Sequence, residues 1–205
     1  MLSALARFLQ EHYPSLTVTG PLFYHWPVFL RFDLQHEALS TSEDAYFDEV
    51  VRRARLLFKA VFSSDDPVLI AYQYARYKRH RIRNSHYLLQ QLKVSTADLH
   101  FQKMVNPGFL APSKWARMHV STTTTRIAYA AILSAIGNQD FRGRIPVLHG
   151  QVFFLNQRTG LAFHMYDDRG LDILGSDAAS LRYLYETHNN LILDYDRARI
   201  ATLFD

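Results

Sequence analysis

Acidic residues gather in two short segments near the C-terminal end of the chain. Asp167, Asp168 and Asp172 follow a predicted strand, and Asp194 and Asp196 follow a second apolar run. Hard cations such as Mg²⁺ and Mn²⁺ take oxygen ligands, and strand ends hold such ligands firmly. The pattern therefore permits the metal site of a hydrolase or nuclease, with His164 as the candidate base.

A structural network explains the same residues. Arg169 and Arg197 stand beside the acids, and arginine and carboxylate form strong paired hydrogen bonds. In this interpretation the two segments form an Asp-Arg corner that joins the last hairpin to the last helix. Its members are Asp167, Asp168, Arg169, Asp194, Asp196 and Arg197. We place this reading first, and with it we predict no catalytic residue, no metal and no cofactor.

A basic run lies in the middle of the chain. It contains Arg76, Lys78, Arg79, Arg81 and Arg83, with tyrosines in and around it. We predict that these residues bind a partner. Basic side chains with interleaved aromatic rings also suit nucleic acid, because cations bind phosphates and rings stack on bases. As a third alternative, the same residues are typical of an edge strand whose charges prevent aggregation.

Several familiar kinds of site are missing from the sequence. The chain has no cysteine, which excludes disulfides and thiolate chemistry and fits a reducing cytoplasm. Its histidines lack the spacing of a zinc hydrolase, and there is no glycine-rich phosphate loop or dinucleotide fingerprint. No apolar stretch approaches the roughly 20 residues needed to span a bilayer. We therefore expect a cytoplasmic protein without a membrane partner.

Hydrophobic periodicity predicts an α+β fold in which amphipathic helices pack on a mainly antiparallel sheet. Strands are expected at residues 28–34, 68–74, 151–155, 161–166 and 171–174. Helices are expected from about residue 44 to 62, from 124 to 136, after 177 and from 196 to 203. The helix at 124–136 is apolar nearly all round, which predicts a buried central helix, and residues 92–115 are expected to be irregular. With 205 residues, one domain spanning 1–205 is the default.

Several motifs in order resemble a bacterial family. These are HWPVFLRFDL at 25–34, RARLLFKAVF at 53–62, GNQDF at 137–141, VFFLN at 152–156, MYDDRGLDIL at 165–174 and LILDYDRARI at 191–200. Together they resemble domain of unknown function 3885 over roughly residues 22–205. Leu171 and Leu191 stand where members of the family often carry cysteine and tryptophan, which argues against a catalytic cysteine. The resemblance implies a fold and no activity.

These observations favour a non-enzymatic binding protein. Small cytoplasmic bacterial proteins without catalytic motifs are often immunity proteins, and this analogy of class leads us to expect one here. Its partner would be a cognate toxin, such as a secreted nuclease effector of a toxin-antitoxin or type VI secretion setting. The alternatives that stay open are a metal-dependent hydrolase or nuclease that uses the acidic cluster, and nucleic-acid binding through residues 76–83.

Overall fold

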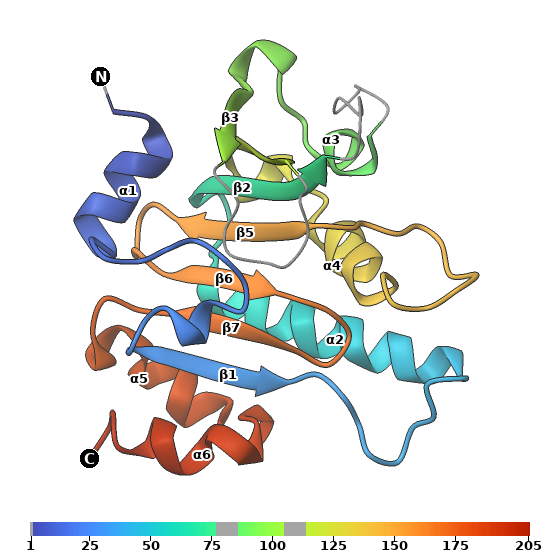
Figure 1. Cartoon of the computed structure of the whole chain (residues 1–205). Coiled ribbons are helices and arrows are strands. Elements are labelled where there is room, and N and C mark those ends of the chain that lie inside the picture. The colour runs from blue at the N-terminus through green and yellow to red at the C-terminus, as the bar shows by residue number, and fades with distance from the viewer. Residues whose placement is uncertain (1, 77–85, 105–113) are drawn as a thin grey trace.

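A seven-stranded antiparallel sheet organises the protein, with strand order β1-β7-β6-β5-β2-β4-β3 (Figure 1). The structure is a computed structural model that describes residues 2–76, 86–104 and 114–205, without the side chains of residues 75, 76 and 114. The strands are β1 Phe29–Asp33, β2 Pro67–Arg76, β3 His100–Met104, β4 Lys114–Thr123, β5 Gln151–Asn156, β6 Ala162–Met165 and β7 Gly170–Leu174. The helices are α1 Ala4–His12, α2 Asp44–Val61, α3 Tyr87–Gln91, α4 Tyr129–Gly137, α5 Ala178–Thr187 and α6 Asp194–Ala201. The predicted α+β class is confirmed.

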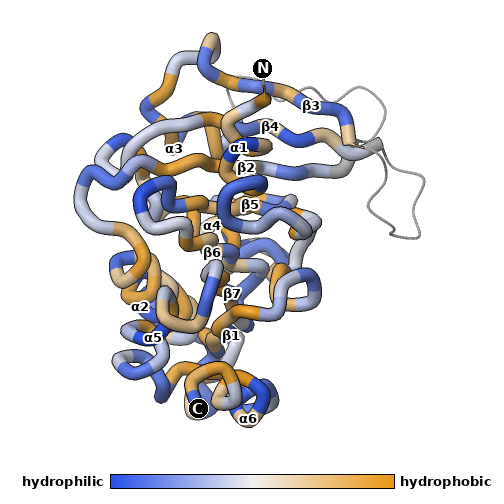
Figure 2. The backbone as a smooth tube through the Cα atoms, turned by 90° about the vertical axis from the view of Figure 1, so that its left-hand side faces the viewer, coloured by the Kyte–Doolittle hydropathy of each residue, from blue (hydrophilic) through white to orange (hydrophobic). Residues whose placement is uncertain are grey.

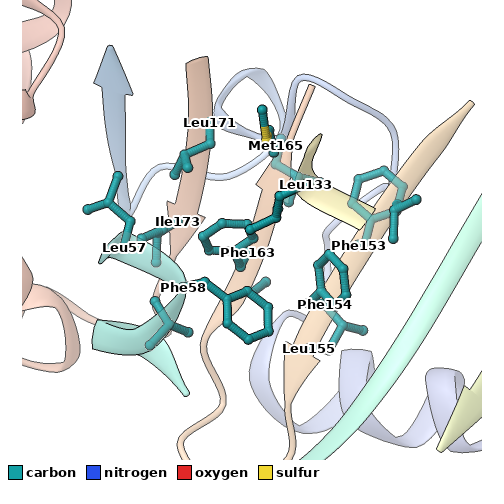
Figure 3. Close-up of a cluster of buried hydrophobic side chains, with 14 of the residues drawn as sticks. Leu57, Phe58, Leu133, Phe153, Phe154, Leu155, Phe163, Met165, Leu171 and Ile173 are labelled. Carbon is teal, nitrogen blue, oxygen red and sulfur yellow. The ribbon is translucent and has the colours of Figure 1, made fainter. Parts of the chain in front are cut away.

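Helix α2 covers one face of the sheet. Its apolar residues recur every three or four positions, which places them on a single side of the helix. The buried members are Tyr46, Phe47, Val50, Ala54, Leu57, Phe58 and Val61. At the centre, the Phe58 ring stacks on Phe62 and Tyr129. It also meets the rings of Phe154 and Phe163 edge-on, so α2 is joined to β5 and β6 (Figure 3).

The predicted central helix is present as α4, which packs beside α2 on the same face. Ile132, Leu133, Ala135 and Ile136 are buried. The helix begins at Tyr129 and not at residue 124, because residues 124–126 form a 3-10 turn. Figure 2 shows that hydrophobic residues follow the strands, whereas many outer turns are hydrophilic. Within the described residues, no helix is long and apolar enough to cross a membrane.

The other face of the sheet is covered by residues 13–28, which we call the N-terminal strap (Figure 1). The strap contains no strand, so its backbone groups need partners from elsewhere. Gln73 donates to the carbonyl of Val18 at 2.7 Å, and Gln151 accepts from the amide of Gly20 at 3.3 Å. Polar side chains inside the sheet therefore take the place of a neighbouring strand.

The expectation that residues 92–115 are irregular is partly wrong. Residues 100–104 form β3, and the long strand β4 begins at Lys114. All five residues of β3 are exposed or half-buried, so no alternation marks the strand in the sequence. Strand β4 carries a usable signal, because Ala116, Met118 and Val120 are buried at alternate positions. The serines and threonines at the end of β4 are polar, so they hide this alternation in the sequence.

Asp66 ties the end of α2 to the hairpin between β5 and β6. Arg158 donates to both of its carboxylate oxygens, at 2.6 and 2.9 Å, and Asn156 donates to it at 2.9 Å. Asn156 also donates to the carbonyl of Val61. Mainly because of the bonds from Arg158, the pKa of Asp66 is lowered to about 2. The buried carboxylate is therefore ionised at every pH near neutrality.

We expect this network to make stability fall in acid. A folded-state pKa below the unfolded value stabilises the fold above about pH 4, and this stabilisation is lost as pH falls toward 2. Arg158→Gln should lower the free energy of unfolding near pH 7, because it removes the cation that pairs with the buried Asp66 carboxylate. The loss should shrink between pH 4 and pH 2, measured by urea denaturation. A loss that is the same at both ends of this range would contradict the assignment.

Candidate functional site

Arg31 lies where the two acidic segments meet. It stands in β1 directly opposite Asp172 of β7, and residues paired in this way point to the same face of a sheet. Its NH1 donates to Asp196 Oδ2 at 3.0 Å, and its Nε lies 4.0 Å from Asp172 Oδ1. The Nε also donates to the Tyr166 hydroxyl at 3.2 Å, and the guanidinium lies 4.1 Å above the Phe23 ring. One cation therefore joins β1, β7 and α6.

The outer edge of β1 brings α6 to this cation. Phe32 forms an isolated bridge with Ile192, and the amide of Leu193 donates to the carbonyl of Arg31 at 2.9 Å. Helix α6 begins at the next residue, which places Asp196 in its first turn. An acid is favourable there, because backbone amides at a helix N-terminus carry partial positive charge.

Asp172 is the most deeply buried acid of the cluster, with an exposed fraction of 0%. Burial raises its pKa to about 7, although the amide of Phe23, the charge of Arg31 and the amide of Leu22 oppose that shift. Its Oδ2 accepts from the Phe23 amide at 3.3 Å. Its Oδ1 has no hydrogen-bond partner within the described part of the chain. Asp172 therefore connects the sheet to the N-terminal strap.

Asp167 and Asp168 form a separate group in the turn between β6 and β7. Asp167 accepts from the backbone amide and from the Nε of Arg169, each at 2.8 Å. Asp168 accepts from the Tyr46 hydroxyl at 2.5 Å, which connects the turn to α2. Burial raises the pKa of Asp168, and burial together with Asp168 raises the pKa of Tyr46 to about 12. The proton between them therefore stays on the tyrosine.

Asp140 completes a group of three carboxylates with Asp167 and Asp168. One oxygen from each lies within 4.8 Å of the other two. Asp140 is exposed, whereas the other two acids are buried. Oxygen donors at this spacing suit a hard cation in composition. Because Asp167 is already bound by Arg169, an incoming cation would have to share that carboxylate with a guanidinium or displace it.

His164 lies under the N-terminal strap, apart from Asp140, Asp167 and Asp168 but in register with Asp172. It stands opposite Asp172 on the neighbouring strand, and its ring stacks on Phe153 with centroids 4.3 Å apart. Gly20 of the strap lies so close that any side chain at that position would overlap the ring. Burial lowers the pKa of His164 to about 3, so the ring is neutral. In the described residues, neither ring nitrogen has a hydrogen-bond partner.

Asp194 and Arg197 form a local pair at the start of α6. The Nε of Arg197 donates to Asp194 Oδ1 at 2.9 Å. Its other nitrogens donate to the carbonyls of Asn189 and Ile192, at 3.0 and 2.9 Å. The pair therefore closes the 3-10 turn that precedes α6, and Asp194 is separate from the other acids.

The structure divides the predicted site residues into distinct places. Asp172 and Asp196 share Arg31, whereas Asp167 and Asp168 lie in the β6–β7 turn and His164 lies beneath the strap. In the predicted basic run, Arg76 ends β2, and Lys78, Arg79, Arg81 and Arg83 lie outside the described residues.

Three residues important to this site were missed from the sequence: Arg31, Tyr46 and Asp140. Arg31 and Asp140 stand within motifs that carried the family resemblance, and that was the available signal. Tyr46 had no such signal, because it reads as one more member of the apolar stripe of α2.

Removing the central cation should destabilise the fold strongly. Arg31→Met leaves Asp172 and Asp196 buried without their counter-charge, which should lower the free energy of unfolding by about 3–5 kcal/mol. Arg182→Met is the control, because its pair with Glu186 is more than half exposed on both sides and should cost about 1 kcal/mol or less. Urea denaturation at pH 7 measures both, and equal losses would contradict the central role of Arg31.

Asp172 should add a pH dependence of opposite sign to that of Asp66. Its raised pKa favours folding while it is protonated, so its contribution to stability is lost as pH rises from about 4 to about 7. Relative to the unaltered protein, the free energy of unfolding of the Asp172→Asn variant should therefore rise by about 1–3 kcal/mol over this pH range. Denaturation at pH 4.5 and pH 8 checks the sign, with Asp194→Asn as the exposed control. A difference that is constant with pH would refute the assignment.

Comparisons with known proteins place the chain in a family without assigning a function. A family model described as a domain of unknown function, DUF3885, matches residues 5–196, so the match begins earlier and ends sooner than the motifs indicated. The chain is 21% identical over 214 residues to the uncharacterized protein YnaE of Bacillus subtilis (strain 168), covering 93% of this chain and 98% of that protein. No solved structure matches. The chain belongs to the family of domain of unknown function 3885.

Proposed function

We propose that this protein is a non-catalytic binding protein, most concretely an immunity protein that neutralises a cognate toxin. One observation carries the proposal: each of the five acids that the sequence marked as catalytic candidates already has a partner inside the chain. The pairs are Asp167 with Arg169, Asp168 with Tyr46, Asp172 and Asp196 with Arg31, and Asp194 with Arg197.

Hydrolysis at these residues would need oxygens or a base free to reach a substrate. Asp172 and His164 are covered by the strap, and the low pKa of His164 makes its ring a weak base. The paired acids instead join β1, β7, α2 and α6, which is the work of a structural corner. A rigid scaffold of this kind suits recognition, because little ordering remains to be done when a partner binds.

The proposal of a toxin partner rests on an analogy of class. Small proteins that carry charged surfaces and no catalytic motif are commonly used in bacteria to bind and silence a toxin, and charge governs the rate and specificity of such association. The nucleic-acid alternative rests on residues 76–83, which are not described except for the backbone of Arg76, and it stays a prediction.

Co-expression with the proteins encoded by the flanking genes tests the proposal. We expect one of them to be toxic alone, to be neutralised by this protein and to co-purify with it. Asp140→Asn combined with Asp168→Asn should protect equally well, because a binding protein does not need these carboxylates as ligands. Mg²⁺ should leave the melting temperature unchanged. Loss of protection in the folded double variant, together with a Mg²⁺-dependent rise in melting temperature that the variant lacks, would instead favour the metal-dependent hydrolase.

A further inference from the structure

A groove of about 690 Å³ runs along the outer side of α2. Its second wall is the end of α4 and the loop that follows it. The lining includes Asp48, Arg55, Leu56 and Lys59 on one side and Arg144 and Ile145 on the other. This surface belongs wholly to described residues.

The far wall of the groove is held in place by Arg144. Its Nε donates to Asn138 Oδ1 at 3.1 Å, and its guanidinium lies 3.5 Å above the ring of Phe47. Asn138 in turn donates to the carbonyl of Pro146 at 3.0 Å. Arg144 also pairs with Asp44, whose side chain is 90% exposed. The arginine is therefore positioned before any partner arrives, which reduces the entropy lost on binding.

The near wall, on α2, carries positive charge that the fold does not use. Arg55 and Lys59 are one helical turn apart, so they point the same way. Within the described part of the chain, neither forms an ion pair with a carboxylate. Arg52 is paired with Glu49, and Asp48 is the acidic residue of the lining, so the lining keeps an excess of positive charge. A bound segment of opposite charge would gain from all of these cations.

Aliphatic side chains stand beside these cations. Ile145 is 87% exposed and Leu56 is 39% exposed, and both line the groove. The aromatic lining residue, Phe47, is buried beneath Arg144 and has no face open for a base to stack on. Cations beside open aliphatic groups suit an amphipathic protein segment better than a nucleic acid, whose bases need exposed rings.

We propose that this groove binds an acidic, amphipathic segment of the partner protein, with carboxylates on Arg55 and Lys59 and an apolar residue on Leu56 and Ile145. The inference rests on the proposed binding function and names its surface. It also refines the partner: the substrate face of a nuclease is positively charged, so a nuclease toxin would dock through an acidic region outside that face.

A synthetic peptide tests the surface without the natural partner. The probe is a 15-residue peptide in which successive helical turns carry glutamate and leucine in alternation. One control peptide has lysine in place of each glutamate, and a second has serine in place of each leucine. We expect the acidic peptide to shift NMR amide signals of α2 and residues 138–146, and each control to bind at least tenfold more weakly. Shifts centred elsewhere, or a 15-nucleotide single-stranded DNA that binds more tightly, would overturn the proposal.

Charge reversal provides the matched comparison. Arg55→Glu with Lys59→Glu should weaken peptide binding at least tenfold, whereas Lys93→Glu with Lys103→Glu, an equal charge change at exposed sites elsewhere, should not. Undiminished binding by the folded groove variant overturns the inference. If a toxin is identified, the groove variant should also lose protection. If both variants neutralise a toxin equally, the groove is not the binding surface, but the proposed immunity function is supported. If the peptide binds the groove and no toxin is found, the groove is supported as a binding surface and the immunity function is not.

Discussion

A guanidinium group placed between two buried carboxylates joins the beginning of the chain to its end. Arg31 belongs to the first strand, Asp172 to the last strand and Asp196 to the last helix. Burying these groups is costly, and the arrangement is tolerable because Arg31 faces both acids and hydrogen bonds from the Phe23 amide and to the Tyr166 hydroxyl add to the pairing. The contact also fixes α6 along the outer edge of β1, which covers an edge that could otherwise pair with another chain.

The same constraint reaches the second face of the sheet through Asp172. A sheet covered on both sides usually has apolar residues on both, yet here Gln73 and Gln151 occupy strand positions that point at the strap. Their presence follows from the strap itself, because an extended segment without a strand partner exposes amides and carbonyls that must be satisfied. Several buried polar atoms on this face still lack partners in the described residues, among them both nitrogens of His119.

Local patterns predicted what depends on local chemistry. Helix α2 could be predicted because its apolar stripe fits one helical face. The hairpin of β5 and β6 could be predicted because Asn156 and Gly160 mark the two ends of a short turn. Strand β4 was missed although Ala116, Met118 and Val120 alternate, because the serines and threonines at its end hide that alternation. For the candidate site, Asp167 and Arg169 were recognisable as neighbours in sequence. The partner of Asp196 was not, since Arg31 lies 165 residues away.

Charges that are paired inside a fold and charges left open on its surface have different consequences. The acids of the corner are the most distinctive feature of the sequence, but their fields are largely cancelled by Arg31 and Arg169 at short range. Arg55 and Lys59 look ordinary in sequence, as solvent-facing positions of an amphipathic helix. Because the described residues offer them no carboxylate, their attraction is available to another molecule. Distinctive residue types therefore mark how this protein is held together, whereas unmatched charge marks the surface that we propose for binding.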